Sequence, residues 1–254
     1  MLRYKTGKKP ARRDAVKLKF ASYFKSSALP PVPKVFGRPW LIRNFGMLGN
    51  DQYGCCVWAG FAHETMLLRA DADTTVPMFT TNCVLRDYAA CTGFNPNDPS
   101  TDQGTDVQEA AAYRQKTGII DALRQRHQID IYTALTPGNL TQLAAAVYFL
   151  GAAGVGVNLP DDAEDQFDRA EPWSIGGTHT GNGHYISCIG RNSLGNFLFV
   201  SWGRLQAATP EWVYRNMDEG LAFVSRERLK ATGLSPQGFD LAALEDDFQA
   251  VTSS

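Results

Sequence analysis

The chain has 254 residues, 44% of them hydrophobic, which is enough for one large domain or for two subdomains that share a cleft. Its 25 basic and 26 acidic residues nearly balance, so the overall charge favours neither nucleic acid nor a membrane surface as a partner. No apolar run approaches the roughly 20 residues of a membrane span, and the N-terminus lacks the apolar core of a secretion signal. We therefore expect neither a membrane span nor export.

Residues 1–45 are expected to form a basic arm followed by a proline-rich linker. Residues 1–20 hold eight Lys or Arg against a single acid, Asp14, and residues 30–33 read Pro-Pro-Val-Pro, an extended segment. The arm is either a solvated, flexible extension or a docking arm for an acidic surface or a partner subunit.

Residues 46–254 are expected to form one domain with two halves. In the first half, about 46–135, apolar residues recur at helical spacing over 55–70, 82–91 and 106–117, and the segment 92–105 has the composition of a loop. Gly118 is a suitable stop for the third helix. This half is therefore predicted to be helical.

The second half, about 136–254, is expected to be rich in strands. A helix over 140–150 precedes strands over 154–159, 184–190 and 196–202, with an acidic surface excursion at 161–173. A short helix over 210–216, a strand over 221–224 and an acidic amphipathic helix over 240–251 follow. The fold class predicted by the whole pattern is α+β.

A polar, glycine-containing loop, residues 49–54, leads into Cys55 and Cys56 at the predicted start of the first helix. Helix starts carry unpaired N–H groups and a positive dipole end, which lower the pKa of a thiol and favour the nucleophilic thiolate. Five cysteines are an odd number, so at least one stays free unless it pairs with another chain. Cys83 and Cys91 would lie about 12 Å apart on one helix, too far for a disulfide, and we expect both to be buried.

A thiol nucleophile needs an imidazole to accept its proton, and the chain has four histidines. His63 would lie about 10 Å from Cys56 along the same helix, too far to be its base. His127 stands in a charged segment and is expected at the surface, and His179 lies in a glycine-rich loop. His184 opens an apolar strand that can hold its ring toward a cleft. We expect His184 to be the base, the alternative being a structural histidine.

Metal and cofactor chemistry find no support in the sequence. Cys55, Cys56, His63 and Cys83 lack the spacing of a zinc site. The chain contains neither a phosphate-binding loop nor a dinucleotide fingerprint. We expect no metal and no cofactor.

Four motifs in chain order resemble the papain-like cysteine peptidases. They are the cysteine at a helix start, the turn 102–104 with the helix after it, the segment 181–190 with His184, and Ser201-Trp202-Gly203 at a strand end. The resemblance spans about residues 46–225. It is closest to a divergent group from phage and prophage genomes, through Met47 to Cys56, Trp202 to Gln206 and Pro10 to Asp14. It implies a helical half and an antiparallel, β-barrel-like half with the cleft between them.

The resemblance also implies roles for individual residues. The family carries an oxyanion-binding amide six residues before its nucleophile, which selects Cys56 with Asn50, and Gln52 is the second choice for the amide. Cys55 stands where the phage-type proteins carry Asp, either as a small neutral substitute or as a partner for a vicinal disulfide with Cys56. Trp202, Gly203 and Gly104 are expected to line the cleft.

One position departs from the family pattern. Papain-like enzymes carry an Asn directly before Ser-Trp-Gly that orients the imidazole, and this chain has Val200 there. Losing an orienting group is expensive, about 10⁴ in rate in the serine-protease case. Asn182 and Ser201 are the candidates to replace it.

Two functions remain open from the sequence. One is a thiol hydrolase of phage origin, a cysteine peptidase that acts on peptide or isopeptide bonds of a polypeptide substrate. The other is a catalytically weak or inactive papain-fold component of a phage particle, with structural or attachment duty and the basic arm docking on other virion proteins. Either is expected in the host cytoplasm or on the virion.

Overall fold

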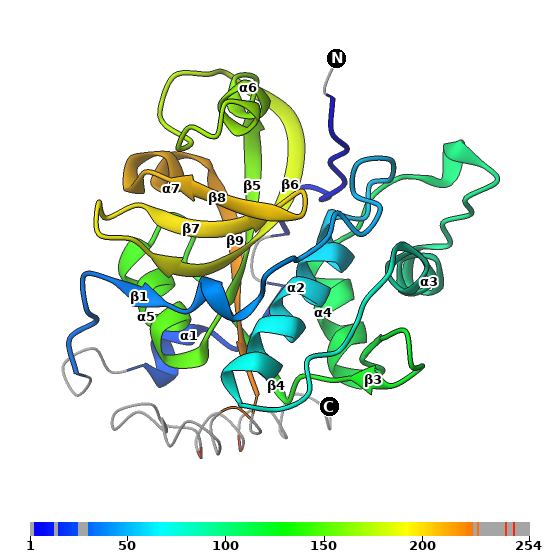
Figure 1. The fold of residues 1–254 in the computed structure, drawn as a ribbon, viewed down its shortest axis with the longest axis horizontal. Helices are drawn as coiled ribbons and strands as arrows, with labels where there is room; N and C mark the ends of the chain where they lie inside the picture. Colours follow the sequence, from blue (N-terminus) through cyan, green and yellow to red (C-terminus); the bar gives the residue numbers. More distant parts are fainter. Residues whose placement is uncertain are drawn as a thin grey trace.

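The computed structural model describes residues 3–12, 15–24 and 30–225, together with Arg228, Ala242 and Asp246. The expected helix over 240–251 lies almost wholly outside the described residues. Figure 1 shows two halves side by side, one built from helices and one from a curved sheet, and the N-terminal segment enters between them. The α+β prediction is therefore correct.

The helical half is built on a long central helix. Two further helices and a small two-stranded sheet surround it, and capping side chains fix their starts: Thr80 accepts from the amide of Cys83, and Asp106 from those of Gln108 and Glu109. The elements are α2 (Cys56–Asp71), α3 (Thr81–Thr92), η3 (Pro99–Thr101), α4 (Val107–Lys116), β2 (Ile119–Ile120) and β3 (Arg126–His127).

The other half is an antiparallel sheet in the order β4-β9-β5-β6-β7-β8, with β1 paired to β6. Helices pack against it and close a large apolar core. The strands are β1 (Phe36–Gly37), β4 (Ile131–Leu135), β5 (Ala153–Pro160), β6 (His179–Arg191), β7 (Phe197–Ser201), β8 (Arg204–Ala208) and β9 (Met217–Val224). The helices are α1 (Phe20–Tyr23), η2 (Pro39–Leu41), α5 (Leu140–Leu150), α6 (Ala163–Asp168) and α7 (Pro210–Asn216).

The two halves meet where α2 crosses β6. A Cβ at Gly60 would lie 2.5 Å from the Tyr185 ring, so only glycine allows this close approach. One turn further, the buried Glu64 pairs with Arg114 and accepts hydrogen bonds from Tyr185 (2.8 Å) and Ser187 (3.0 Å). A buried carboxylate needs such partners, so this network sets the position of α2, and of Cys56 at its start, against β6.

Most expected elements are present, and the differences have local causes. The segment expected as a surface excursion, 161–173, contains α6 and buries Phe167 and Trp173 in the core of the sheet half. The strand expected from His184 begins at His179, because the polar residues before His184 continue the pairing with β5. Cys83 is buried, whereas Cys91 is only half-buried.

The basic arm differs from the expectation of a solvated extension. Residues 3–12 lie against the domain, and the side chain of Lys8 is fully buried. Val16, Leu18 and Phe20 are buried as well, Leu18 and Phe20 in the core of the sheet half. The described part of residues 1–45 thus belongs to the same packed unit.

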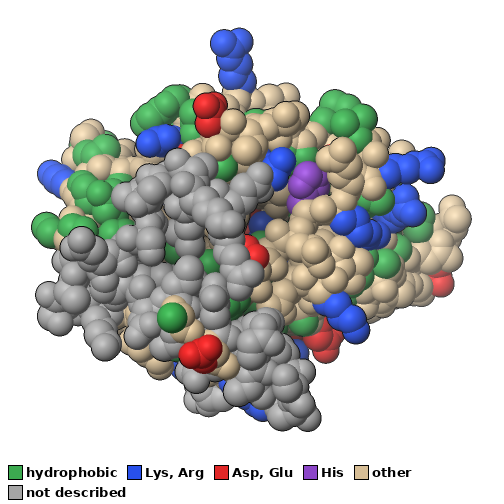
Figure 2. All heavy atoms as spheres, turned by 90° about the horizontal axis from the view of Figure 1, so that it is seen from below, with side chains coloured by type: hydrophobic (Ala, Val, Ile, Leu, Met, Phe, Trp, Pro, Cys, Tyr) green, Lys and Arg blue, Asp and Glu red, His purple; other side chains and the backbone are tan. Residues whose placement is uncertain are grey.

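Seen from below (Figure 2), hydrophobic side chains of the described residues form small groups separated by charged and polar ones. Among the described residues no helix is long and apolar enough to cross a membrane.

Candidate active site

Cys56 is the first residue of α2, and the residue is 1% exposed at the junction of the two halves. Burial raises the pKa of the Cys56 thiol to about 11, although the backbone amides of Tyr185, Gly7 and Val57 face it and pull the other way. The expectation of a lowered thiol pKa is therefore wrong for this state of the protein: removal from water outweighs the helix start. At neutral pH the thiol is protonated.

Cys55 points away from this position. Its Sγ lies 3.8 Å from the carbonyl oxygen of Leu48, and burial raises its pKa well above the ordinary value. All five cysteines are free, so the two neighbouring thiols are not joined as a vicinal disulfide.

His184 lies on β6, beside Tyr185, whose backbone amide faces the Cys56 thiol. Its Nε2 is 3.0 Å from Ser201 Oγ, and its ring stacks on Trp202 with centroids 4.5 Å apart. Within the described part of the chain, Nδ1 is buried and has no hydrogen-bond partner, Cys56 Sγ included. Burial lowers the pKa of His184 to about 3, so the ring is neutral.

Ser201, at the end of β7, supplies the contact that Val200 cannot. Neighbouring strand residues face opposite sides, so the buried Val200 packs with Ile189 and Leu67 while Ser201 faces the imidazole. The other candidate, Asn182, donates to Thr180 Oγ1 instead. The structure thus brings together His184 and Ser201 and leaves Asn182 out.

Trp202 closes the site from the side of the sheet. It forms the turn between β7 and β8 with Gly203 and has a φ of 44°, which is rare for a residue with a side chain. Its ring stacks between His184 and Tyr4. Gly203 lies against the backbone of Gly46, beside the loop that precedes α2, rather than at the thiol.

Asn50, the first choice for the oxyanion amide, lies at the segment formed by residues 5–9. It is buried, and its Nδ2 donates to the carbonyl oxygens of Lys5 and Tyr53, each at 3.2 Å. Gln52 is exposed, and its Nε2 donates to Asp51 Oδ2 at 3.4 Å. Of the two amides, only Asn50 therefore points into the cleft.

The cleft holds an extended peptide segment, residues 5–9 of the chain itself. On the sheet side, the amides of Gly7 (3.2 Å) and Lys8 (3.0 Å) donate to the carbonyl of Gly183. On the helical side, the backbone carbonyl of Thr105 accepts from the Lys9 amide, and the Thr105 amide donates to the Gly7 carbonyl. These two bonds form a parallel β-bridge between Lys8 and Thr105. Both walls therefore bind main-chain groups of the same segment.

Glycines allow the segment to pass so closely. A Cβ at Gly7 would lie 2.0 Å from the carbonyl oxygen of Gly54, and a Cβ at Gly104 would lie 2.3 Å from that of Gly7. Gly104, expected to line the cleft, therefore lies directly beside the bound segment. Besides the hydrogen bond from Asn50, the Lys5 carbonyl accepts one from Trp202 Nε1 at 3.1 Å.

The remaining histidines lie outside this arrangement. His63 bonds the carbonyl of Gly46, and burial lowers its pKa to about 4. His127 pairs with Asp121, and His179 contacts Asn216. Among the described residues no group of three or more His, Cys, Asp or Glu side chains could hold a metal ion.

The segment in the cleft is the feature that the sequence did not reveal. Basic residues on either side of it meet acids of this same chain: Arg3 pairs with Asp165 and Asp168, and Arg12 pairs with Asp106. The excess of positive charge in residues 1–20 was the available signal, and it left two interpretations open, a solvated extension or a docking arm for an acidic surface or a partner subunit.

Comparison with known proteins adds a fold likeness. No protein-family model and no curated protein matches the chain. Among solved structures, xylellain, a cysteine protease from Xylella fastidiosa, aligns with a TM-score of 0.65 at 13% identity over 89% of this chain and 98% of that one.

Two precursors of cysteine proteases align as well. Procathepsin B S9 from Trypanosoma congolense gives a TM-score of 0.59 at 13% identity (87% of this chain, 86% of that one). A recombinant stem bromelain precursor gives 0.58 at 12% identity (88% and 78%). None of the three is described as a phage protein. The alignments and the two-half architecture together show that this chain has the papain-like cysteine protease fold.

Proposed function

We propose that the protein is a thiol peptidase of the papain type, held in a latent state by residues 5–9. The observation that carries the proposal is the peptide segment in the cleft. The Gly7 amide of the segment faces the Cys56 thiol. The Lys5 carbonyl accepts from Asn50, and the amides of Gly7 and Lys8 donate to the carbonyl of Gly183. A cleft whose two walls both bind extended main chain is suited to a polypeptide substrate.

The chemistry follows from the same side chains once the segment leaves. With one ring proton on Nε2 and donated to Ser201 Oγ, His184 offers the Nδ1 lone pair to the Cys56 thiol proton. The thiolate attacks the acyl carbon, and Asn50 Nδ2 with the Cys56 amide holds the tetrahedral oxyanion. The imidazolium returns its proton to the leaving amine, which leaves a thioester. Water, deprotonated by His184, then hydrolyses the thioester and frees the thiol.

Hydrolysis of a labelled, unfolded protein such as casein tests the proposal. Gly7→Val in the full chain would clash with Gly54 and displace the segment without cutting it off. We expect this variant to hydrolyse casein and the parent chain to be slow. Asn50→Ala should reduce the rate about 10²- to 10³-fold, whereas Gln52→Ala, the exposed amide two residues away, should leave it unchanged. Equal rates for Gly7→Val with and without Cys56→Ala would refute the proposal.

A second candidate is a papain-fold protein without catalysis, serving as a structural or attachment component of a phage particle. The specific observation in its favour is that Cys56 and His184 form no hydrogen bond to each other within the described residues. The phage connection, and with it a location in the host cytoplasm or on the virion, rests on the motifs at residues 10–14, 47–56 and 202–206. This candidate gains if the displaced-segment variant binds polypeptides but hydrolyses none.

A further inference from the structure

The side chain of Lys8 is buried in a pocket whose wall carries two carboxylates, near the Cys56 thiol. Its Nζ lies 3.0 Å from Asp218 Oδ2 and 3.1 Å from Glu219 Oε1, and none of the side chain is exposed. Burying an ammonium costs several kcal/mol unless acids compensate it, so these two carboxylates are what makes the pocket fit a cation.

The pocket belongs to the same cleft that binds the segment's main chain. The Lys8 amide donates to Gly183, the residue directly before His184. The wall opposite is Gly156 on β5, where a Cβ would lie 2.7 Å from Lys8 Cδ and 2.6 Å from Glu219 Cγ. Any larger residue at Gly156 would fill the space, so the glycine keeps the pocket deep enough for a long side chain.

The vacant pocket would favour a new cation. The Glu219 side chain is 10% exposed, and burial raises its pKa, with the charge of Lys8 as the main opposing influence. When Lys8 leaves, the carboxylate loses its charge partner. A polypeptide that brings a positive charge restores the pair, and one that brings an apolar side chain does not.

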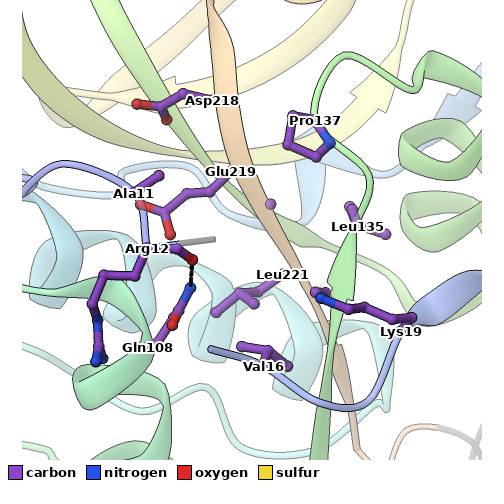
Figure 3. Close-up of a pocket in the computed structure, with 12 residues that line it drawn as sticks. Ala11, Arg12, Val16, Lys19, Gln108, Leu135, Pro137, Asp218, Glu219 and Leu221 are labelled. Carbon is purple, nitrogen blue, oxygen red and sulfur yellow. Dashed lines mark hydrogen bonds between the residues drawn. The ribbon is translucent and has the colours of Figure 1, made fainter. Parts of the chain in front are cut away.

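The acidic wall also borders open space. A cavity of about 330 Å³ begins beside Asp218 and Glu219, and Figure 3 shows both side chains leaving β9 on the side of the N-terminal segment. The second carboxylate oxygen of Asp218, Oδ1, has no hydrogen-bond partner within the described residues. A guanidinium offers five donors and can use this spare acceptor, so arginine as well as lysine fits here.

We propose that Lys8 occupies the peptidase's own side-chain selection pocket, and that Glu219 and Asp218 make the enzyme select polypeptides that present lysine or arginine there. This inference rests on the proposed peptidase function for its catalytic consequence, but the pocket's preference for a cation can be measured without catalysis.

Hydrolysis of matched peptides tests the selection. In the Gly7→Val background, fluorogenic peptides that differ at one position (Lys, Arg, Leu or Glu) are compared by kcat/KM, with that position moved along the peptide. We expect one position at which Lys and Arg exceed Leu by about 30-fold or more, the loss associated with an unpaired buried charge. Glu219→Gln should abolish most of this ratio and Asp218→Asn part of it. Glu211→Gln, an exposed acid on α7, should leave the ratio unchanged.

Binding separates failure of this inference from failure of the peptidase proposal. A synthetic peptide of residues 3–12 and the same peptide with leucine in place of Lys8 are titrated, by fluorescence polarisation, into a Gly7→Val, Lys8→Ala chain. Tighter binding of the lysine peptide, lost in Glu219→Gln, supports the pocket even if no peptide is hydrolysed. Equal binding of the two peptides, or a lysine preference that survives Glu219→Gln, overturns it.

Discussion

Alkylation of Cys56 is the most direct measure of the segment in the cleft. The change is Gly7→Val. A Cβ at position 7 would lie only 2.0 Å from the carbonyl oxygen of Gly54, so the valine side chain overlaps that carbonyl. The segment cannot keep its place with that overlap, while the domain around it is untouched. Water then reaches the thiol, and the burial that raises its pKa is relieved.

The expected magnitude follows from the ionisation of the thiol. A pKa of about 11 leaves a thiolate fraction of about 10⁻⁴ at pH 7, whereas the ordinary value near 9 gives about 10⁻². Opening the cleft should therefore speed alkylation by at least about 100-fold, before the gain in access is counted. In the parent chain, labelling should still rise with pH beyond 9.

The assay is iodoacetamide labelling at pH 7, followed by peptide mapping that separates Cys56 from the other four cysteines. Cys188 is an internal control, because it lies fully buried in the core of the sheet half and should stay unlabelled unless the protein unfolds. Lys9→Ala is the matched variant, since it changes an exposed side chain of the same segment without a clash. Equal rates for the parent chain and Gly7→Val, with Cys188 protected in both, would refute the reasoning.

Three further outcomes are expected. Ser201→Ala removes the hydrogen-bond partner of His184 Nε2. In the Gly7→Val background it should lower kcat about tenfold or more with KM little changed, while Ser201→Thr restores kcat. An unaltered kcat in Ser201→Ala would argue against a positioning role. Arg114→Met leaves Glu64 buried without its charge partner and should reduce the free energy of unfolding in urea by about 3–5 kcal/mol, with recovery when Glu64→Gln is added; an additive further loss would contradict this. The pKa of His63 in the folded protein is about 4, below its ordinary value of 6.5. As the pH falls from 6.5 to 4, His63 therefore binds a proton in the unfolded chain but stays neutral in the folded one. Stability should drop toward pH 4, and His63→Asn should remove about 3 kcal/mol of that drop, as urea titrations at a series of pH values will show.

The helices and strands could be predicted because their signals are local. The helix that begins at Cys56 and the one over 140–150 were predicted to within a residue or two, since apolar spacing and terminal glycine or capping residues act over a few positions. Strand β8 (Arg204–Ala208) was not predicted, because its sequence carries two exposed residues and its pairing with β7 is set by the turn at Trp202 and Gly203.

The candidate site was predictable only in part. The six-residue spacing selected Cys56 with Asn50, and the order of the later motifs selected His184. In the structure Asn50 contacts Lys5 of the segment, the Gly7 amide faces the Cys56 thiol, and His184 contacts Ser201. Which residue contacts the imidazole was left open between Asn182 and Ser201, because it depends on where Asn182 turns its side chain on β6 and on which face of β7 Ser201 lies. The thiol's pKa was expected on the wrong side of its ordinary value, since the sequence shows the helix start but not the chain that buries it.

By itself the sequence determined the α+β class, the thiol at a helix start and the histidine at the edge of a strand, all features of short stretches of chain. Only the tertiary structure decided that residues 5–9 fill the cleft and that Lys8 meets Glu219. These residues are 211 positions apart, and no local pattern encodes their contact. The pairing arises because a buried ammonium and a buried carboxylate each need the other, and folding brings them to the same pocket.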